Sequence, residues 1–202
     1  MNKEQKTVLS TPAHPHLQGQ LLPIKTYPDP VLKKVASPYS LSKMTREEKE
    51  DLKILIQDML YTMYHAPGIG LAAPQIGLSK KLFVLDVDYT REKVELGQTG
   101  KFFHKLENFN PQIFINPRFI QRQGEIIWEE GCLSVPGIYE KVKRFSHVVL
   151  EYETLEEETK QLEATDLFAV CLQHEYDHLE GIVFIEKLSP LKKTFITKKL
   201  KS

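Results

Sequence analysis

Hydrophobic positions recur every three or four residues between 45 and 65, which predicts a helix with one buried stripe. The stripe consists of Leu52, Leu55, Ile56, Met59, Leu60 and Met63. Thr45-Arg46-Glu47-Glu48 has the spacing of a capping box, so the helix begins there. Pro67-Gly68 ends it near residue 65.

Further along, the pattern predicts a different kind of element. Strands are expected at 82–87, 112–120, 124–130, 141–145, 147–154 and 160–164. Asp166 is expected to cap a second helix that reaches Leu179 and ends at Gly181. This order of elements predicts an α+β fold, with mostly antiparallel strands packed around a central helix.

The length of 202 residues fits one domain, since a domain usually takes about 100–200 residues. We expect a flexible N-terminal tail at 1–22, one folded domain at 23–190 and a basic C-terminal helix or tail at 191–202. Residues 88–111 are charged and contain glycine, which indicates an exposed insertion in the domain.

Composition excludes several classes of function. The 27 basic and 27 acidic residues balance, so no strong field favours nucleic acid or an anionic membrane. No apolar run approaches the about 20 residues that span a bilayer, and the N-terminus lacks the apolar stretch of a secretory signal. We therefore expect a cytoplasmic protein whose two cysteines, Cys132 and Cys171, are reduced.

The most informative segment is His174-Glu175-Tyr176-Asp177-His178, a His-Glu-x-x-His motif on the second predicted helix. Residues four apart on a helix have Cβ atoms about 5–6 Å from each other. His174 and His178 are therefore placed to bind one metal ion, and Glu175 is placed to exchange a proton with a water on that ion. The motif predicts metal-assisted hydrolysis and leaves the third ligand open.

Both cysteines are candidates for that third ligand. Cys171 shares the helix, but seven residues place it about 10 Å along the axis from His178. Ligands of one tetrahedral ion lie only about 3.5–4 Å apart. A small buried apolar residue is therefore the better interpretation of Cys171. Cys132 stands where a strand enters a Gly/Pro turn, which suits a ligand presented to another element; a buried structural thiol is the alternative.

Three motifs in order resemble those of the peptide deformylase family. They are Gly-Ile-Gly-Leu-Ala-Ala-Pro-Gln at 68–75, Glu-Gly-Cys-Leu-Ser at 130–134 and Gln-His-Glu-Tyr-Asp-His at 173–178, and the resemblance covers about 23–190. It implies removal of the formyl group from the N-terminal formylmethionine of nascent polypeptides, with release of formate. It also implies one divalent metal ion, with Fe2+ expected and Zn2+, Ni2+ or Co2+ as alternatives.

The resemblance assigns roles to particular residues. Cys132, His174 and His178 would be the metal ligands, and Glu175 the general base and then the acid. Gln75 and the backbone N–H of Leu133 would stabilise the negative charge that develops on the formyl oxygen, where one donor is typically worth about 10²–10³ in rate.

The substrate-binding residues are also expectations from the resemblance. They are Gly68, Ile69, Gly70, Glu130, Leu167, Val170 and Cys171. The glycines would let a peptide backbone pair with the loop, and the apolar side chains would receive methionine. Core packing explains Leu167 and Val170 equally well. Glu130 next to the ligand strand needs a partner if it is buried, and Arg144 is the candidate. Tyr139 departs from the arginine found in many relatives.

Two other functions stay open on the sequence. One is a zinc endopeptidase of the His-Glu-x-x-His type with a distant third ligand. The other is a metal-binding relative without catalytic activity. The Lys-rich end at 192–201 is a candidate ribosome contact, with a solvated helix face as the alternative. The expected partners are formylmethionyl peptides, with the ribosome as a possible further contact. We expect no direct binding to nucleic acid and no binding to membrane.

Overall fold

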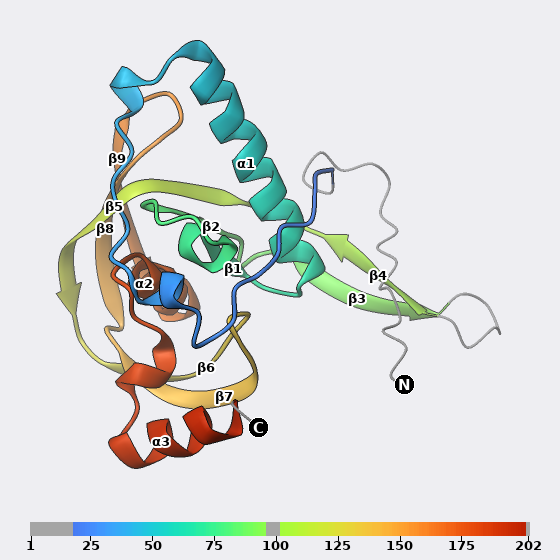
Figure 1. The fold of residues 1–202 in the computed structure, drawn as a ribbon, viewed down its shortest axis with the longest axis vertical. Helices are drawn as coiled ribbons and strands as arrows, with labels where there is room; N and C mark the ends of the chain where they lie inside the picture. The colour runs from blue at the N-terminus through green and yellow to red at the C-terminus, as the bar shows by residue number, and fades with distance from the viewer. Residues whose placement is uncertain (1–17, 96–101, 201–202) are drawn as a thin grey trace.

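The computed structural model describes residues 18–95 and 102–200, which form nine strands and three α-helices (Figure 1). The helices are α1 Arg46–His65, α2 Asp166–Leu179 and α3 Pro190–Lys199. The strands are β1 Gly70–Ala72, β2 Leu82–Leu85, β3 Thr90–Glu95, β4 Phe102–Glu107, β5 Gln112–Gln123, β6 Ile126–Cys132, β7 Val135–Arg144, β8 His147–Glu153 and β9 Thr159–Thr165. All pairings between these strands are antiparallel, so the predicted α+β class is confirmed.

A five-stranded sheet in the order β1-β2-β5-β8-β9 separates two hydrophobic clusters. Leu82 and Val84 on β2 belong to the cluster under α1, while Phe83 and Leu85 belong to the cluster with α2. Successive side chains of a strand point to opposite faces. Strand β2 is therefore buried on both sides, because one helix covers each face of the sheet.

Helix α1 follows the predicted pattern closely. The Thr45 hydroxyl accepts a hydrogen bond from the Glu48 N–H, and the Glu48 carboxylate accepts one from the Thr45 N–H, which confirms the capping box. Leu52, Ile56, Met59, Leu60 and Met63 are buried, as the stripe predicts.

Helix α2 lies in the middle of the molecule (Figure 1). Thr165 occupies the N-cap position and Asp166 is the first helical residue, so the expected cap at Asp166 is wrong by one position. Gly181 follows the helix with a φ of +69°, and a side chain there would contact the Lys33 carbonyl 2.7 Å away. Only glycine fits this close approach, which confirms the predicted end.

Two hairpins differ from the predictions. Strand β7 begins at Val135, not at 141, because Cys132 pairs with Val135 and the turn is made by Leu133 and Ser134. Pro136 and Gly137 are part of the strand, although they are typical of turns. The charged insertion at 88–111 contains the β3–β4 hairpin, whose strands were not predicted.

The predicted terminal segments lie only partly within the described residues. Residues 1–17 fall outside them, while Gln20 and Leu22 donate backbone hydrogen bonds to Asp58 and Thr62 on α1. At the other end α3 is helical and buries Ile196 in a third hydrophobic cluster with β7. None of the helices described is both long and apolar enough to cross a membrane.

Candidate metal centre

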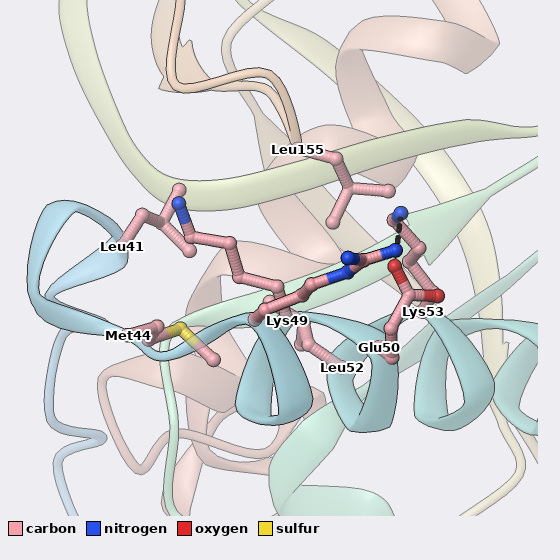
Figure 2. A pocket seen from close by; sticks show the side chains of 8 residues that line it. Leu41, Met44, Lys49, Glu50, Leu52, Lys53 and Leu155 are labelled. Atoms are coloured by element: carbon pink, nitrogen blue, oxygen red, sulfur yellow. Dashed lines mark hydrogen bonds and ion pairs between the residues drawn. The ribbon is translucent and has the colours of Figure 1, made fainter.

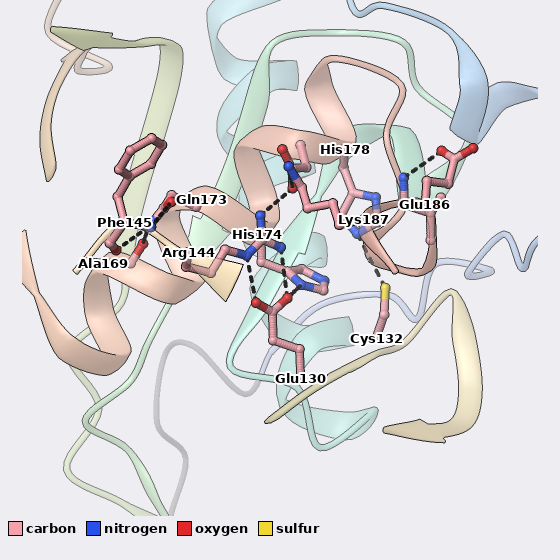
Figure 3. Close-up of polar contacts among 12 residues, drawn as sticks. Glu130, Cys132, Arg144, Phe145, Ala169, Gln173, His174, His178, Glu186 and Lys187 are labelled. Atoms are coloured by element: carbon pink, nitrogen blue, oxygen red, sulfur yellow. Dashed lines mark hydrogen bonds and ion pairs between the residues drawn. The ribbon is translucent and has the colours of Figure 1, made fainter. Parts of the chain in front are cut away.

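One group of potential metal ligands stands out among the described residues. The ligand atoms of Cys132, His174 and His178 all lie within 4.8 Å of one another. Helix α2 places the two imidazole rings one turn apart, with centroids 5.1 Å from each other, and Cys132 comes from the end of β6. The Sγ atom of Cys132 lies 3.3 Å from Nε2 of His178 (Figure 3).

This donor set fits a divalent transition metal. Nδ1 of His174 lies 2.8 Å from a Glu130 carboxylate oxygen, which fixes the ring and leaves Nε2 facing the other two ligands. Burial lowers the pKa of His178 well below its ordinary value, so its imidazole is in the neutral form that binds metals. One thiolate and two imidazoles are suited to iron and zinc.

Glu130 anchors a buried network behind the centre. Its carboxylate accepts hydrogen bonds of 2.6 and 2.8 Å from Nε and Nη2 of Arg144, so the predicted ion pair is present. Arg144 also pairs with Asp177, which in turn contacts Lys187 at 3.1 Å. Burial alone would raise the pKa of Glu130, but the hydrogen bonds from Arg144 and His174 hold it at about 2. Glu130 is therefore a carboxylate that orients His174.

Glu175 lies on α2, directly after His174, and lines a cleft. It is only 5 % exposed, and its Oε2 atom has no hydrogen-bond partner in the part of the chain described. Burial raises the pKa of this carboxyl to about 7, against the opposing effect of His174. A side chain at Gly70 would overlap the Glu175 carboxylate, so the backbone of β1 runs directly beside it. A buried carboxyl with a free oxygen is a candidate for proton transfer.

Gln75 is held with its amide nitrogen toward Cys132. Its Oε1 accepts a hydrogen bond of 2.8 Å from the Ala72 N–H. Its Nε2 lies 3.2 Å from the Ser134 hydroxyl oxygen and 3.6 Å from Cys132 Sγ. The sequence interpretation missed Ser134, although its position two residues after Cys132 was available as a signal.

A cleft of about 490 Å³ opens onto these groups. All seven residues predicted to bind substrate line it, and so do Gln75, Leu133, Cys132, His174 and Glu175. The sequence interpretation missed other lining residues, namely Trp128, Val135, Pro136 and Ile138. Tyr139 lies over Gly131 at the rim, where a side chain on Gly131 would meet its ring at 2.6 Å. Burial raises the pKa of Cys171, so this thiol is a neutral wall residue, as expected.

A separate cavity of about 350 Å³ lies at the beginning of α1 (Figure 2). Three of its charged side chains have partners: Lys53 contacts Glu50 at 2.8 Å, and Lys49 pairs with Glu157. His174 and the other candidate ligands lie elsewhere, so this cavity has no part in the proposed chemistry.

Comparisons with known proteins identify the family of the chain. The family model for polypeptide deformylase matches residues 21–194. A peptide deformylase of Erythrobacter litoralis is 46% identical over 184 residues, covering 86% of this chain and 92% of its own. The crystal structure of a peptide deformylase from Legionella pneumophila superposes with a TM-score of 0.72 at 36% identity, over 90% of this chain and 94% of that one.

A further solved structure carries a peptide. It is the Met-Ala-Ser-bound peptide deformylase of Acinetobacter baumannii, with a TM-score of 0.68 at 28% identity, over 85% of this chain and 100% of that one. The match to the family model spans both hairpins, all three motifs and most of the described chain. The chain belongs to the polypeptide deformylase family.

Proposed function

We propose that Cys132, His174, His178 and Glu175 form the active site at which this deformylase removes the N-formyl group of formylmethionyl peptides. The activity itself, a metal-dependent hydrolysis that releases formate, follows from membership of the family. The observation that carries the assignment is the convergence of three ligand atoms within 4.8 Å beside a buried carboxyl.

The donor set supports Fe2+ as the resident ion, with Zn2+, Ni2+ or Co2+ able to take its place. A bound ion supplies Lewis-acid chemistry, polarising the formyl oxygen and lowering the pKa of water toward neutrality. Cys132 contributes the thiolate, and His174 and His178 each contribute a ring nitrogen. Glu130 holds His174 in the required orientation.

Proton transfer falls to Glu175. Glu175 lines the cleft, its Oε2 has no hydrogen-bond partner among the described residues, and its carboxylate accepts the proton of the attacking water. The same carboxyl then delivers that proton to the nitrogen of the leaving amine. Gln75 Nε2 and the Leu133 N–H donate hydrogen bonds to the formyl oxygen as it becomes negative. The bond between Gln75 Oε1 and Ala72 keeps the Gln75 donor aimed at this position.

The peptide lies along β1 in this proposal. Strand β1 stands at one edge of the five-stranded sheet, where an added strand can pair with it. Gly68 and Gly70 allow close approach of the peptide backbone, and Ile69, Leu167, Val170 and Cys171 receive the methionine side chain. The related structure that holds Met-Ala-Ser supports a peptide in this cleft.

The remaining proposals concern the setting of the enzyme. We assign catalysis to a domain at 23–190 and place the enzyme in the cytoplasm. Helix α3 exposes Leu191 and Phe195 beside several lysines, which supports a contact with the ribosome. Lys192 and Lys193 also pair with Glu140 and Glu186 on the enzyme itself.

Anaerobic purification followed by metal analysis and assay tests the proposal. We expect one divalent ion per chain, release of formate from formyl-Met-Ala-Ser and no cleavage of an acetylated peptide with only internal bonds. Exposure to air should reduce the activity, because thiolate and Fe2+ are both oxidisable. Cleavage of internal bonds would favour an endopeptidase, and a metal-loaded protein without formate release would favour a non-catalytic relative.

A further inference from the structure

We infer that Tyr89 is a positioning residue of the reaction, which fixes the Gly68–Gly70 segment against Leu133 and Glu175. The inference rests on the proposed roles of those two residues. Tyr89 lies outside the three motifs, directly before β3 at the base of the β3–β4 hairpin. The insertion at 88–111, which the sequence left without a role, thereby contributes to the active site.

The centre of this arrangement is Asp86, a carboxylate that is only 1 % exposed. Its Oδ1 accepts hydrogen bonds from the N–H groups of Asp88 and Tyr89, at 3.0 and 3.1 Å. Its Oδ2 accepts from the Tyr64 hydroxyl at 2.6 Å and from the Asn110 N–H at 2.9 Å. Asp86 therefore joins both ends of the hairpin to α1, since it satisfies four donors with two oxygens.

From this base two bonds reach the substrate segment. The Tyr89 hydroxyl donates to the Gly68 carbonyl at 3.0 Å, and the Asp86 N–H donates to the Ile69 carbonyl at 2.8 Å. The ring of Tyr89 packs edge-on against Tyr64 with centroids 5.0 Å apart, which limits its movement. Two successive carbonyls of the segment are thus held by Tyr89 and Asp86.

The Gly68–Gly70 segment also lies against Leu133 and Glu175, the proposed catalytic groups. A side chain at Gly68 would lie 2.8 Å from Leu133 Cδ1, and one at Gly70 would overlap the Glu175 carboxylate. The segment is therefore confined between the hairpin base and the catalytic groups. Loss of the Tyr89 hydrogen bond to the Gly68 carbonyl allows the segment to move away from Leu133. This movement widens the site where the peptide backbone pairs.

Tyr89→Phe in the metal-loaded enzyme tests this inference, with Tyr152→Phe on β8 as the matched control. Each substitution removes the hydroxyl of a partly buried tyrosine, but only the first removes the bond to Gly68. A neutral hydrogen bond of this kind corresponds to about a 2–10-fold change. We expect Tyr89→Phe to raise KM for formyl-Met-Ala-Ser by that factor, with kcat changed less than twofold, and Tyr152→Phe to leave KM within about twofold.

Hydrogen exchange of the amides at 68–70 provides a readout that does not depend on turnover. We expect faster exchange there in Tyr89→Phe than in Tyr152→Phe. Equal KM values and equal exchange in the two variants would overturn the inference, as would a change in both variants to the same extent. If the unmodified enzyme released no formate, the proposed function would fail, while the exchange comparison would still decide the role of Tyr89.

Discussion

Helices α1 and α2 cover opposite faces of the same sheet, yet of the two only α2 carries residues of the proposed active site. Helix α1 packs one apolar stripe inward and turns its charged side chains, such as Lys53 and Glu50, to solvent. Helix α2 is enclosed, and it buries Gln173, Glu175 and His178 along with its apolar residues. The two helices therefore differ in whether their polar side chains face solvent or are buried inside the protein.

Burial decides which polar atoms are available. On α2, Gln173 bonds the backbone N–H and carbonyl of Phe145, both at 2.9 Å, and Asp177 pairs with Arg144. A buried polar group without a partner costs about 1–3 kcal/mol, so such groups are rare without a function. The atoms left without a partner on α2 are Glu175 Oε2 and His178 Nδ1, within the part of the chain described. Both belong to the proposed active site.

The largest effect that this comparison predicts is on Cys132. Cys132→Ser should remove the thiolate ligand, so the protein loses its metal and releases no formate while the fold persists. Cys171→Ala is the matched control and should keep the metal, because Cys171 lies outside the ligand group. Metal analysis and formate assays on both variants check this. Full metal and activity in Cys132→Ser would exclude it as a ligand.

Arg144→Met should have the next largest effect. It leaves Glu130 buried without its guanidinium partner and leaves Asp177 with Lys187 alone, and such a loss typically costs about 3–5 kcal/mol in the free energy of unfolding. Freed from Arg144, Glu130 should hold His174 less firmly, so metal affinity falls by about 10–100-fold. Lys53→Met removes a partner from an exposed pair on α1 and should change the free energy of unfolding by less than about 1 kcal/mol. Denaturant unfolding and metal titration would show both, and equal effects of the two variants would contradict the comparison.

Met59→Ala on α1 should affect stability without affecting chemistry. The side chain is fully buried, so its truncation should cost about 2–5 kcal/mol in the free energy of unfolding. We expect an unchanged kcat at a temperature where the variant stays folded. Ile54→Ala, at a position that is 61% exposed, should cost about 0.5 kcal/mol or less. A selective loss of kcat in Met59→Ala would mean that α1 contributes to catalysis directly.

The smallest effect is expected at the capping box. Thr45→Ala removes the hydroxyl that accepts from the Glu48 N–H and should cost about 1 kcal/mol in the free energy of unfolding. Thr45→Ser retains an acceptor and should restore most of that loss. Thermal or denaturant unfolding distinguishes the two. A destabilised Thr45→Ser variant would indicate that packing of the threonine methyl, not capping, is responsible.

Local patterns predicted the parts of the molecule that depend on near neighbours in the chain. The capping box at Thr45, the end of α2 at Gly181 and the spacing of His174 and His178 all lie within a few residues. The beginning of β7 was missed because register with β6, not the turn propensity of Pro136 and Gly137, places the turn. Register is a contact between two strands, and the residues of one strand do not specify it.

The same distinction between local patterns and contacts distant in the chain applies to the proposed active site. Helix spacing pointed to two candidate ligands and away from Cys171, but the orientation of Gln75 depends on Ala72 and Ser134. The β3–β4 hairpin was not predicted because half of the residues in its two strands are charged and all of them except Leu106 are at least partly exposed. Asp86 supports Gly68–Gly70 through hydrogen bonds between elements that are distant in the chain, so no local sequence pattern predicts this support.

The direct test of the central claim is the turnover of Glu175→Gln measured on protein of known metal content. The substitution keeps the shape of the side chain and the three ligands, but glutamine cannot accept and deliver the proton. We predict a fully metal-loaded protein whose formate release from formyl-Met-Ala-Ser falls by at least about 10²–10⁴-fold. A metal-loaded Glu175→Gln variant with turnover within about twofold of the unmodified enzyme would contradict the account.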